Sequence, residues 1–411
     1  MQKMHPNFDY KALAKEFGTP FYIYDFELIK AKFHALKAAF AARKSQIFYA
    51  VKANSNLSLL AMLAKLDSGF DCVSIGEVQR ALKAGAKPYK IIFSGVAKSA
   101  AELEKALNLG ILYINLESFE EMLLLEKIAQ KSGAKARVSV RINPNVDAKT
   151  HPYISTGLQE NKFGVREDEA RRMYLYAAKS DFLEPVGAHF HIGSQITHLQ
   201  AIFDAASLVA KLVRELKAAQ IELKFFDVGG GLGVVYENES EPELNAYAQG
   251  ILATLSGLDV TICLEPGRYL VAKCGELVSS VLYEKTNGAK RFVIVDAAMN
   301  DFVRPSLYRA FHAIALPYNS GEASPCDVVG GICESGDFFA KDRVLPKSSG
   351  GDLLIIKDAG AYGFSMSSNY NTRPRACELA FENGKVRQIR RRESFEQLIE
   401  NEVGFLKSLD N

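Results

Sequence analysis

The sequence has no excess of charge of either sign. Its 411 residues include 50 lysines and arginines against 48 aspartates and glutamates, which gives a formal net charge of +2. Proteins that bind nucleic acid or an anionic membrane surface usually carry a basic patch. The near balance of charge therefore predicts that neither is a partner of this protein.

Long apolar runs are missing as well. No stretch approaches the roughly 20 apolar residues of a membrane-spanning helix. The start, "MQKMHPNFDY", lacks the basic residues and apolar stretch of a secretory signal peptide. Cysteine is sparse, and its six thiols are scattered over the chain, which favours reduced thiols over a disulfide framework. We therefore expect a cytoplasmic enzyme.

Between about residue 27 and residue 268, helix-period segments alternate with short apolar runs rich in β-branched and aromatic residues. Phe33, Leu36 and Phe40, for example, repeat along one face of a helix. Eight such units match the size of a (β/α)8 TIM-like barrel. An open doubly wound sheet is the alternative, but it would usually carry a Gly-rich phosphate loop after its first strand. The predicted strands are "QIFYAV", "FDCVS", "KIIFS", "LYINL", "RVSVRI", "VGAHFHI", "FFDVG" and "TICLE".

The last 140 residues or so change character. Strand-like segments follow one another there without regular helices, and Asn383-Gly384 in "AFENGKVRQI" is a hairpin signal. We predict a barrel domain at residues 27–273 and a second, mostly antiparallel β domain at residues 274–411. The N-terminal segment, residues 1–26, is expected to join the β domain.

Polar residues and glycines gather where the predicted barrel strands end, which is where such barrels carry their chemistry. Lys52 closes one apolar run, and small residues follow it. Most lysines simply extend into solvent. A lysine desolvated in a pocket, however, has a lowered pKa and can form a Schiff base with an aldehyde cofactor. The other strand ends carry Asp71, Ser94, Arg141, Asn143, His189, His191, Gly229–Gly231, Glu265 and Arg268.

The glycine-rich segment "DVGGGLG", residues 227–233, is neither of the common nucleotide motifs. No Gly-Lys-Ser/Thr follows it, and Tyr236 occupies the place of the last glycine of a dinucleotide fingerprint. A plain tight turn would explain the glycines. After a barrel strand they would also expose several backbone N–H groups, and such a nest binds phosphate.

"HFHIGSQ" places His189 and His191 two residues apart, on one side of a strand. They could begin a zinc site, but no third ligand stands at a convincing spacing, so we expect no metal. We expect one imidazole to stack on a flat cofactor ring, and a buried structural role stays open for His189. In "LEPGRY", Glu265 is either a surface ion-pair partner or a buried carboxylate that keeps a pyridine nitrogen protonated. Lysine, glycines, histidine and glutamate together predict pyridoxal phosphate.

Long stretches of the chain carry a family resemblance. The chain resembles the diaminopimelate decarboxylases, which are fold-type-III, alanine-racemase-like pyridoxal phosphate enzymes. Tyr269 departs from the family, which often has Ser there, and Ala298 replaces a Gly. The matching stretches include "YAVKANSN", "NPNVDAKTHPYISTGLQENKFG", "HFHIGSQ", "DVGGGLG", "EPGR", "MNDFVRPSLY", "CESGDFFAKDR" and "GAYGFSMSSNYNTRPR".

The resemblance implies a role for each matching residue. Lys52 would bind the cofactor covalently, His191 would stack on its ring and Glu265 would bind the pyridine nitrogen. Cys333 would donate a proton. The protein would be a head-to-tail homodimer with shared sites, in which Cys333 and Glu334 come from the other chain. The phosphate would be surrounded by Ser194, Gly230, Gly231, Gly233, Gly267 and Arg268, and the substrate by Arg268, Arg304, Tyr308, Glu334 and Tyr362, the last also near the cofactor.

The implied activity is decarboxylation of meso-2,6-diaminopimelate to L-lysine and carbon dioxide, the last step of lysine biosynthesis. The distal end of this substrate is a zwitterion, so Arg268 and Arg304 can clamp its carboxylate while Glu334 takes its ammonium. The alternative is a decarboxylase of the same fold for ornithine, arginine or carboxynorspermidine, but polyamine precursors would not need both arginines. A racemase would place an arginine where Glu265 stands. A regulator without activity could lack the lysine or the cysteine, and both are present.

Overall fold

The computed structural model describes residues 5–147, 156–157 and 160–406, so the family stretch "NPNVDAKTHPYISTGLQENKFG" lies partly outside the described residues. The chain divides into two compact units. The barrel unit comprises Lys30–Val235 and Glu239–Leu270, and the β unit comprises Met1–Ile29, Tyr236–Asn238 and Val271–Asn411.

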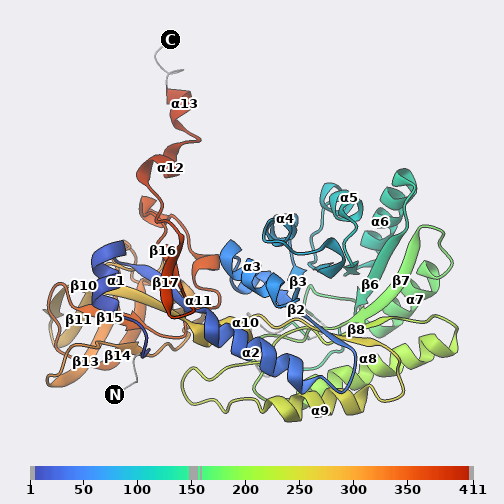
Figure 1. Cartoon of the computed structure of the whole chain (residues 1–411), viewed down its shortest axis with the longest axis horizontal. Helices are drawn as coiled ribbons and strands as arrows, with labels where there is room; N and C mark the ends of the chain where they lie inside the picture. Colours follow the sequence, from blue (N-terminus) through green and yellow to red (C-terminus); the bar gives the residue numbers. More distant parts are fainter. Residues whose placement is uncertain (1–4, 148–155, 158–159, 407–411) are drawn as a thin grey trace. The chain divides into compact units, whose positions relative to one another are not determined.

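The barrel unit is built around strands β2 to β9, which pair in parallel and close because β9 also pairs with β2 (Figure 1). The predicted fold class is confirmed, since each apolar run overlaps one strand. Such strands are apolar because helices cover the outside of a barrel and side chains fill its inside. The strands are β2 (Ser45–Ala50), β3 (Gly69–Cys72), β4 (Ile91–Phe93), β5 (Tyr113–Leu116), β6 (Ala136–Arg141), β7 (Leu183–His189), β8 (Phe225–Asp227) and β9 (Thr261–Leu264).

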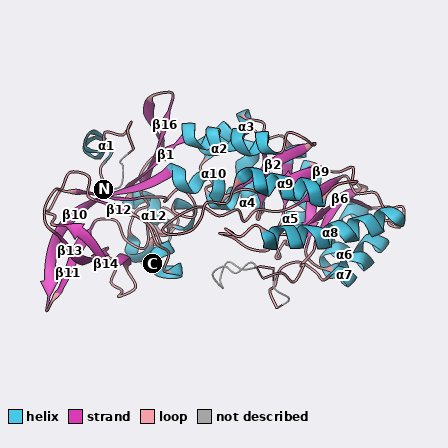
Figure 2. Ribbon diagram, turned by 90° about the horizontal axis from the view of Figure 1, so that it is seen from below, coloured by secondary structure: helices cyan, strands magenta, loops and turns pink. Residues whose placement is uncertain are grey.

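The barrel helices lie outside the strands (Figure 2). In α2 (Phe26–Ala39), the predicted stripe faces inward: Phe33 and Leu36 are buried, as is Phe40 just beyond the helix. Such a stripe ties each helix to the barrel wall. The other helices are α3 (Leu57–Lys65), α4 (Ile75–Lys83), α5 (Ala100–Leu109), α6 (Phe119–Ser132), α7 (Glu167–Ala177), α8 (Gln200–Ala218), α9 (Leu244–Thr254) and the short α10 (Arg268–Val271).

Side chains from different strands fill the barrel. Phe48, Ile92, Tyr113, Val186 and Cys263 form one buried cluster, and each comes from a different strand. The barrel is therefore a packed core and no pore, and reactive groups are confined to its ends.

The β unit holds a mixed sheet in the order β14-β13-β11-β10-β1-β16-β17, with β15 also paired to β10 and β12 to β15. Most pairs are antiparallel, but β1 runs parallel to β16 and β11 parallel to β13. The N-terminal strand joins this sheet, as predicted. The strands are β1 (Phe21–Asp25), β10 (Gly275–Asn287), β11 (Lys290–Val295), β12 (Ile314–Ala315), β13 (Ala323–Val329), β14 (Phe338–Pro346), β15 (Leu353–Ile356), β16 (Cys377–Glu382) and β17 (Lys385–Arg390).

Helices of the β unit are short and few among the described residues. The predicted hairpin is confirmed: β16 and β17 pair around Asn383 and Gly384, which have φ of 51° and 74°. Both values lie in the left-handed region that such a two-residue turn requires. The helices are α1 (Tyr10–Phe17), α11 (Arg304–Tyr308), α12 (Phe395–Ile399) and α13 (Val403–Leu406).

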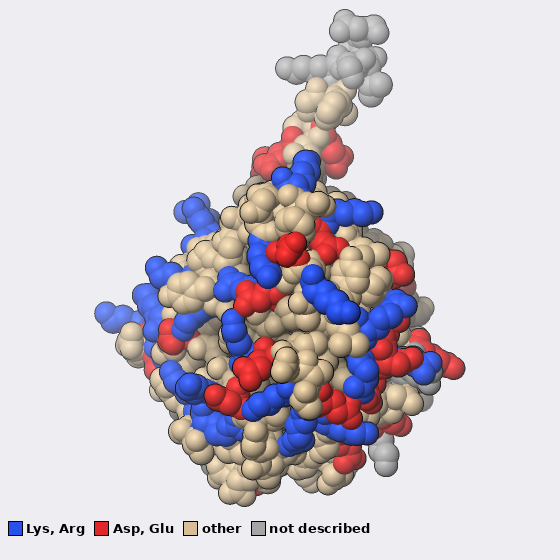
Figure 3. All heavy atoms as spheres, turned by 90° about the vertical axis from the view of Figure 1, so that its right-hand side faces the viewer, with Lys and Arg blue, Asp and Glu red and all other residues tan. Residues whose placement is uncertain are grey.

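The surface agrees with the balanced composition. On the face drawn in Figure 3, basic and acidic side chains are interspersed, with no broad region of one sign. Among the described residues, no helix combines the length and apolar character that crossing a bilayer requires.

Candidate active site

The first group at the carboxyl end of the barrel is Lys52. It follows β2 in a short 3₁₀ turn, Val51–Ala53, and its Nζ lies 3.3 Å from Oδ2 of Asp71. Because β2 pairs with β3, Ala50 lies opposite Asp71. Lys52 follows two residues later, and its side chain therefore lies close to that of Asp71. The carboxylate has no exposed surface, whereas the lysine side chain is 35% exposed. Lys52 is thus an amine held by a buried carboxylate and reachable from outside.

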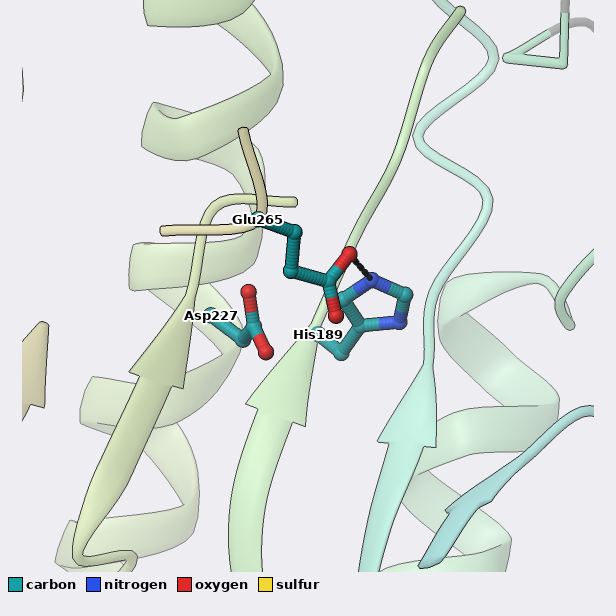
Figure 4. A group of neighbouring side chains, drawn as sticks. All are labelled: His189, Asp227 and Glu265. Atoms are coloured by element: carbon teal, nitrogen blue, oxygen red, sulfur yellow. Dashed lines mark hydrogen bonds and ion pairs between the residues drawn. The ribbon is translucent and has the colours of Figure 1, made fainter. Parts of the chain in front are cut away.

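Three further polar residues end adjacent strands. His189 ends β7, Asp227 ends β8 and Glu265 directly follows β9, and all three are buried. Their side chains gather at one place, where Nε2 of His189 lies 3.3 Å from Oε2 of Glu265 (Figure 4). Asp227 is held by two donors, the N–H of Gly229 and the hydroxyl of Tyr113, at 2.9 and 3.0 Å.

Burial controls the protonation of this cluster. It raises the pKa of Glu265 to about 8, with the charge of Asp71 adding to the effect, and it raises the pKa of Asp227 well above its ordinary value. Burial also lowers the pKa of His189 to about 4, so this imidazole is neutral near pH 7. Oε1 of Glu265 and Nδ1 of His189 are buried without a hydrogen-bond partner. Glu265 therefore offers an acceptor that a bound molecule could use.

The cluster corrects one part of the sequence analysis. Sequence spacing showed no third metal ligand, but folding brings two carboxylates to His189, with donor atoms of all three within 4.8 Å of one another. Asp227 was not singled out, although its position as the polar end of a strand was a usable signal. The absence of a metal stays a prediction.

The glycine segment and His191 meet beside this cluster. The N–H of Gly230 donates to Nδ1 of His191 at 3.2 Å. Burial, and next the charge of Lys52, hold the pKa of His191 well below its ordinary value. A Cβ on Gly229 would lie 2.4 Å from the carbonyl oxygen of Phe190, and one on Gly230 would lie 2.3 Å from that of Glu265. Only glycine lets the backbone pass this close.

The expected nest of exposed N–H groups is wrong for three of these glycines. Gly229 and Gly230 donate to Asp227 and His191, and Gly233 donates to the carbonyl of Ile196 at 2.9 Å. These three glycines are needed because the backbone passes close to its neighbours, and their N–H groups are already used in hydrogen bonds within the protein.

The other predicted phosphate-binding residues lie together in the barrel unit. Nη2 and Nε of Arg268 donate to Oγ of Ser194 at 2.9 and 3.3 Å, and the arginine is buried. A Cβ on Gly267 would lie 3.0 Å from Cβ of Ala53, beside Lys52. Arginine, hydroxyl and tight backbone are typical of an anion site.

In the β unit, α11 carries Arg304 and Tyr308, four residues apart on one helix. Arg304 is buried, and its Nη1 donates to the hydroxyl of Tyr236 at 2.9 Å. Tyr362 is half-buried and has φ of 57°. A left-handed conformation is costly for a tyrosine and often marks a functional position.

Cys333 and Glu334 lie on an exposed loop. Asp337 holds this loop, because its two carboxylate oxygens accept the N–H groups of Ile332 and Met299, each at 2.7 Å. Of the six cysteines, all in the described part of the chain, Cys333 is exposed and the other five are buried. A fixed loop thus presents one thiol to the outside.

Comparison with known proteins identifies the family. Residues 26–272 match the family "Pyridoxal-dependent decarboxylase, pyridoxal binding domain". Diaminopimelate decarboxylase of Campylobacter jejuni is 71% identical over 401 residues, which cover 97% of this chain and 100% of the relative. The chain belongs to the diaminopimelate decarboxylase family.

Solved structures agree. Diaminopimelate decarboxylase of Helicobacter pylori, complexed with L-lysine, is 60% identical and superimposes with a TM-score of 0.94 over 98% of this chain and 100% of that one. Lysine decarboxylase from Selenomonas ruminantium is 25% identical with a TM-score of 0.83, over 93% of this chain and 97% of that one. The fold is therefore shared with decarboxylases of other substrates.

The residues of this family member fit pyridoxal phosphate. Oε1 of Glu265 is a buried acceptor without a partner, which a protonated ring nitrogen would satisfy. Lys52 offers an amine nearby in the same strand-end layer, with Asp71 as its counter-ion. Ser194 and Arg268 offer donors of the kind that a phosphate needs.

Proposed function

We propose that this protein decarboxylates meso-2,6-diaminopimelate to L-lysine and carbon dioxide, with pyridoxal phosphate as cofactor. The observation that carries the proposal is Glu265, a buried carboxylate at the end of the last barrel strand. When bound, pyridoxal phosphate accepts the electron pair that a departing carboxylate leaves, and it does so fully when its ring nitrogen is protonated. A glutamate with a raised pKa supports that protonation, whereas an arginine would oppose it.

The barrel unit holds the cofactor. Lys52 supplies the amine for the cofactor's aldehyde, and Asp71 keeps that amine in place. His191, neutral at physiological pH, packs on the ring face, where an uncharged imidazole leaves the electron demand of the ring intact. The phosphate would be bound by Ser194 and Arg268, where Gly230, Gly231, Gly233 and Gly267 let the backbone come close. Tyr362 is a further residue that we assign to the cofactor.

The substrate's distal end is a zwitterion, and the chain offers complementary charges. Arg268 and Arg304 bind the distal carboxylate through charge-assisted hydrogen bonds, and Glu334 binds the distal ammonium. Tyr308 and Tyr362 orient the carbon chain between them. Binding of this end places the D-centre carboxylate at the cofactor and leaves the L-centre untouched.

Proton donation needs a second chain. We infer a homodimer in which Cys333 and Glu334 of one protomer complete the site of the other, because an exposed thiol is a poor general acid until it is shielded from water. A two-fold dimer then holds two such composite sites. Six free cysteines support a reducing, cytoplasmic location.

The nearest alternative is a decarboxylase for ornithine, arginine or carboxynorspermidine. The buried Arg304 argues against it, since a distal amine gains nothing from an arginine. Release of carbon dioxide should therefore be measured with meso-diaminopimelate, ornithine, arginine and lysine. Turnover of meso-diaminopimelate alone supports the proposal, and preferred turnover of any other substrate refutes it.

A further inference from the structure

A histidine outside the proposed catalytic set lies behind Arg304. His312 stands between α11 and β12 in the β unit and has no exposed surface. Its Nδ1 lies 2.9 Å from the backbone oxygen of Lys357, and its Nε2 lies 3.1 Å from Nη1 of Arg304. Both ring nitrogens thus have a polar neighbour.

These neighbours determine the tautomer. A carbonyl oxygen can only accept, so Nδ1 must carry the hydrogen and donate to Lys357. A guanidinium can only donate, so Nε2 must be the acceptor of a hydrogen bond from Arg304. His312 is therefore a neutral imidazole with one fixed tautomer, because an imidazolium would have no lone pair for Arg304.

Packing fixes this imidazole. The ring of Phe302 meets it edge-on at 4.6 Å and that of Tyr236 at 5.1 Å between centroids. Tyr236 also contacts Arg304, with its hydroxyl 2.9 Å from Nη1 and its ring 4.9 Å from the guanidinium carbon. Nη1 of Arg304 therefore donates to two acceptors at once, a phenol and an imidazole, which restricts rotation of the guanidinium.

We propose that His312 is a positioning residue that orients Arg304 for the carboxylate of the substrate. The proposal rests on the proposed function, which assigns Arg304 to that carboxylate. A neutral acceptor suits this task, since an aspartate in its place would orient the arginine but also cancel the charge that attracts the substrate. His312 orients the guanidinium without adding a negative charge beside it.

The proposal predicts a selective effect. The distal carboxylate is remote from the bond that breaks, so its contact is equally strong before and during reaction, and its loss raises KM more than it lowers kcat. Ligands without this carboxylate should not respond at all. L-lysine has it and 1,5-diaminopentane does not, and otherwise the two have the same chain length and both amines.

Two substitutions separate the two hydrogen bonds of His312. Gln in His312→Gln can place an acceptor near the position of Nε2, toward Arg304, while Asn in His312→Asn can place a donor near the position of Nδ1, toward Lys357. We would titrate the holoenzyme with L-lysine and with 1,5-diaminopentane by calorimetry. His34→Ala, which changes an exposed histidine on α2, is the control. Far-ultraviolet circular dichroism and cofactor absorbance check folding.

The expected result is a loss of discrimination in one variant. His312→Asn should bind L-lysine about tenfold more weakly, as expected for one lost hydrogen bond to a charged group, with 1,5-diaminopentane unchanged. His312→Gln should recover most of this loss, and KM for meso-diaminopimelate should follow the same order. In an Arg304→Met background, His312→Asn should have no further effect.

Three results would overturn the proposal. Discrimination that persists in His312→Asn would show that Arg304 needs no help. Equal weakening of both ligands in both variants, or an additive effect in the Arg304→Met background, would assign His312 a purely structural role. If wild-type protein itself fails to prefer L-lysine, Arg304 does not bind the carboxylate, and the carbon dioxide assay then decides separately whether the proposed activity stands.

Discussion

The end of the barrel and the loop around Cys333 differ in how completely one chain holds its reactive groups. At the barrel end, Asp71, His189 and Glu265 are buried and lie at or next to the carboxyl ends of β3, β7 and β9. On the loop, Cys333 and Glu334 are exposed, although the backbone beneath them is fixed by Asp337. The barrel end buries its polar groups, whereas the loop presents two reactive groups on the surface.

In the proposed mechanism, the difference follows from the task of each group. A carboxylate that sets the protonation of a ring nitrogen must be dry and immobile, and a closed barrel provides both conditions within one chain. A thiol that donates one proton needs only to be delivered to the substrate. A fixed, exposed loop can deliver it across an interface. The exposed loop is therefore compatible with the proposed shared site.

Removing the amine at the barrel end should have the largest effect. Lys52→Ala should abolish the visible absorbance of the bound cofactor and reduce decarboxylation to background, because no other amine takes the place of Lys52 beside Asp71 in the proposal. Lys65→Ala, at the exposed end of α3, should change neither property. A Lys52→Ala protein with an unchanged visible spectrum would contradict the assignment of the barrel end.

Removing the arginine of the β unit should cost less. Arg304→Met should keep cofactor absorbance but lower kcat/KM for meso-diaminopimelate. The loss should correspond to roughly 2–4 kcal/mol of transition-state stabilisation, since a desolvated, charge-assisted contact is lost and a carboxylate stays unpaired. Steady-state kinetics across substrate concentrations test this. Wild-type kcat/KM in the variant would show that Arg304 does not hold the distal carboxylate.

The buried carboxyl should also influence stability when the cofactor is absent. Folding raises the pKa of Glu265 from its ordinary 4.5 to about 8. Glu265 therefore resists ionisation in the folded state. Its contribution to the free energy of unfolding falls as the pH rises from about 5 to 8, because the unfolded chain ionises there first. Glu265→Gln removes this penalty, so protein prepared without cofactor should be stabilised by roughly 4 kcal/mol at pH 8 and little at pH 4.5.

Urea unfolding at the two pH values measures this effect. Glu104→Gln, at an exposed position on α5, is the matched control and should show no such pH dependence. Equal stability changes for Glu265→Gln at pH 4.5 and pH 8 would mean that Glu265 ionises freely, and the barrel end would then not be the dry site described above.

The smallest effect is expected at Tyr236. Tyr236→Phe keeps the ring against Arg304 but removes one of the two acceptors of Nη1. The loss of a single hydrogen bond should lower kcat/KM, mainly through a higher KM. The decrease should correspond to about 1 kcal/mol of transition-state stabilisation. Tyr89→Phe, at an exposed tyrosine, is the control. A loss as large as that of Arg304→Met would show that the phenol itself binds substrate.

The barrel and most of its strand ends could be predicted because the signals are local. Apolar runs mark buried strands, and the residue that follows each run marks the carboxyl end. The partners of individual side chains were harder to predict. Ser118 caps α6 as its Ser-x-x-Glu spacing suggests, but Glu121 pairs with Lys98 at 2.7 Å and accepts the N–H of Glu117. Lys98 is buried and needs a counter-ion, so Glu121 pairs with it and does not complete the capping box with Ser118.

The remaining parts of the site depend on contacts between distant segments. Asp227 and its donor Tyr113 are 114 residues apart, and His312 and the carbonyl of Lys357 are 45 apart. Neither spacing has a period that a sequence pattern can show. A buried histidine in the apolar segment "AFHAIAL" was the one available signal for His312.

The division of labour between the two regions is tested most directly by mixing Lys52→Ala and Cys333→Ala proteins. Each homodimer should be nearly inactive, because each substitution damages both sites. After random subunit exchange about half of the dimers are mixed, and each mixed dimer has one site with both lesions and one intact site. Activity should then return to about a quarter of the wild-type value, if the two sites act independently. If tagged chains prove exchange and no activity returns, Cys333 serves its own chain, and the shared site is wrong.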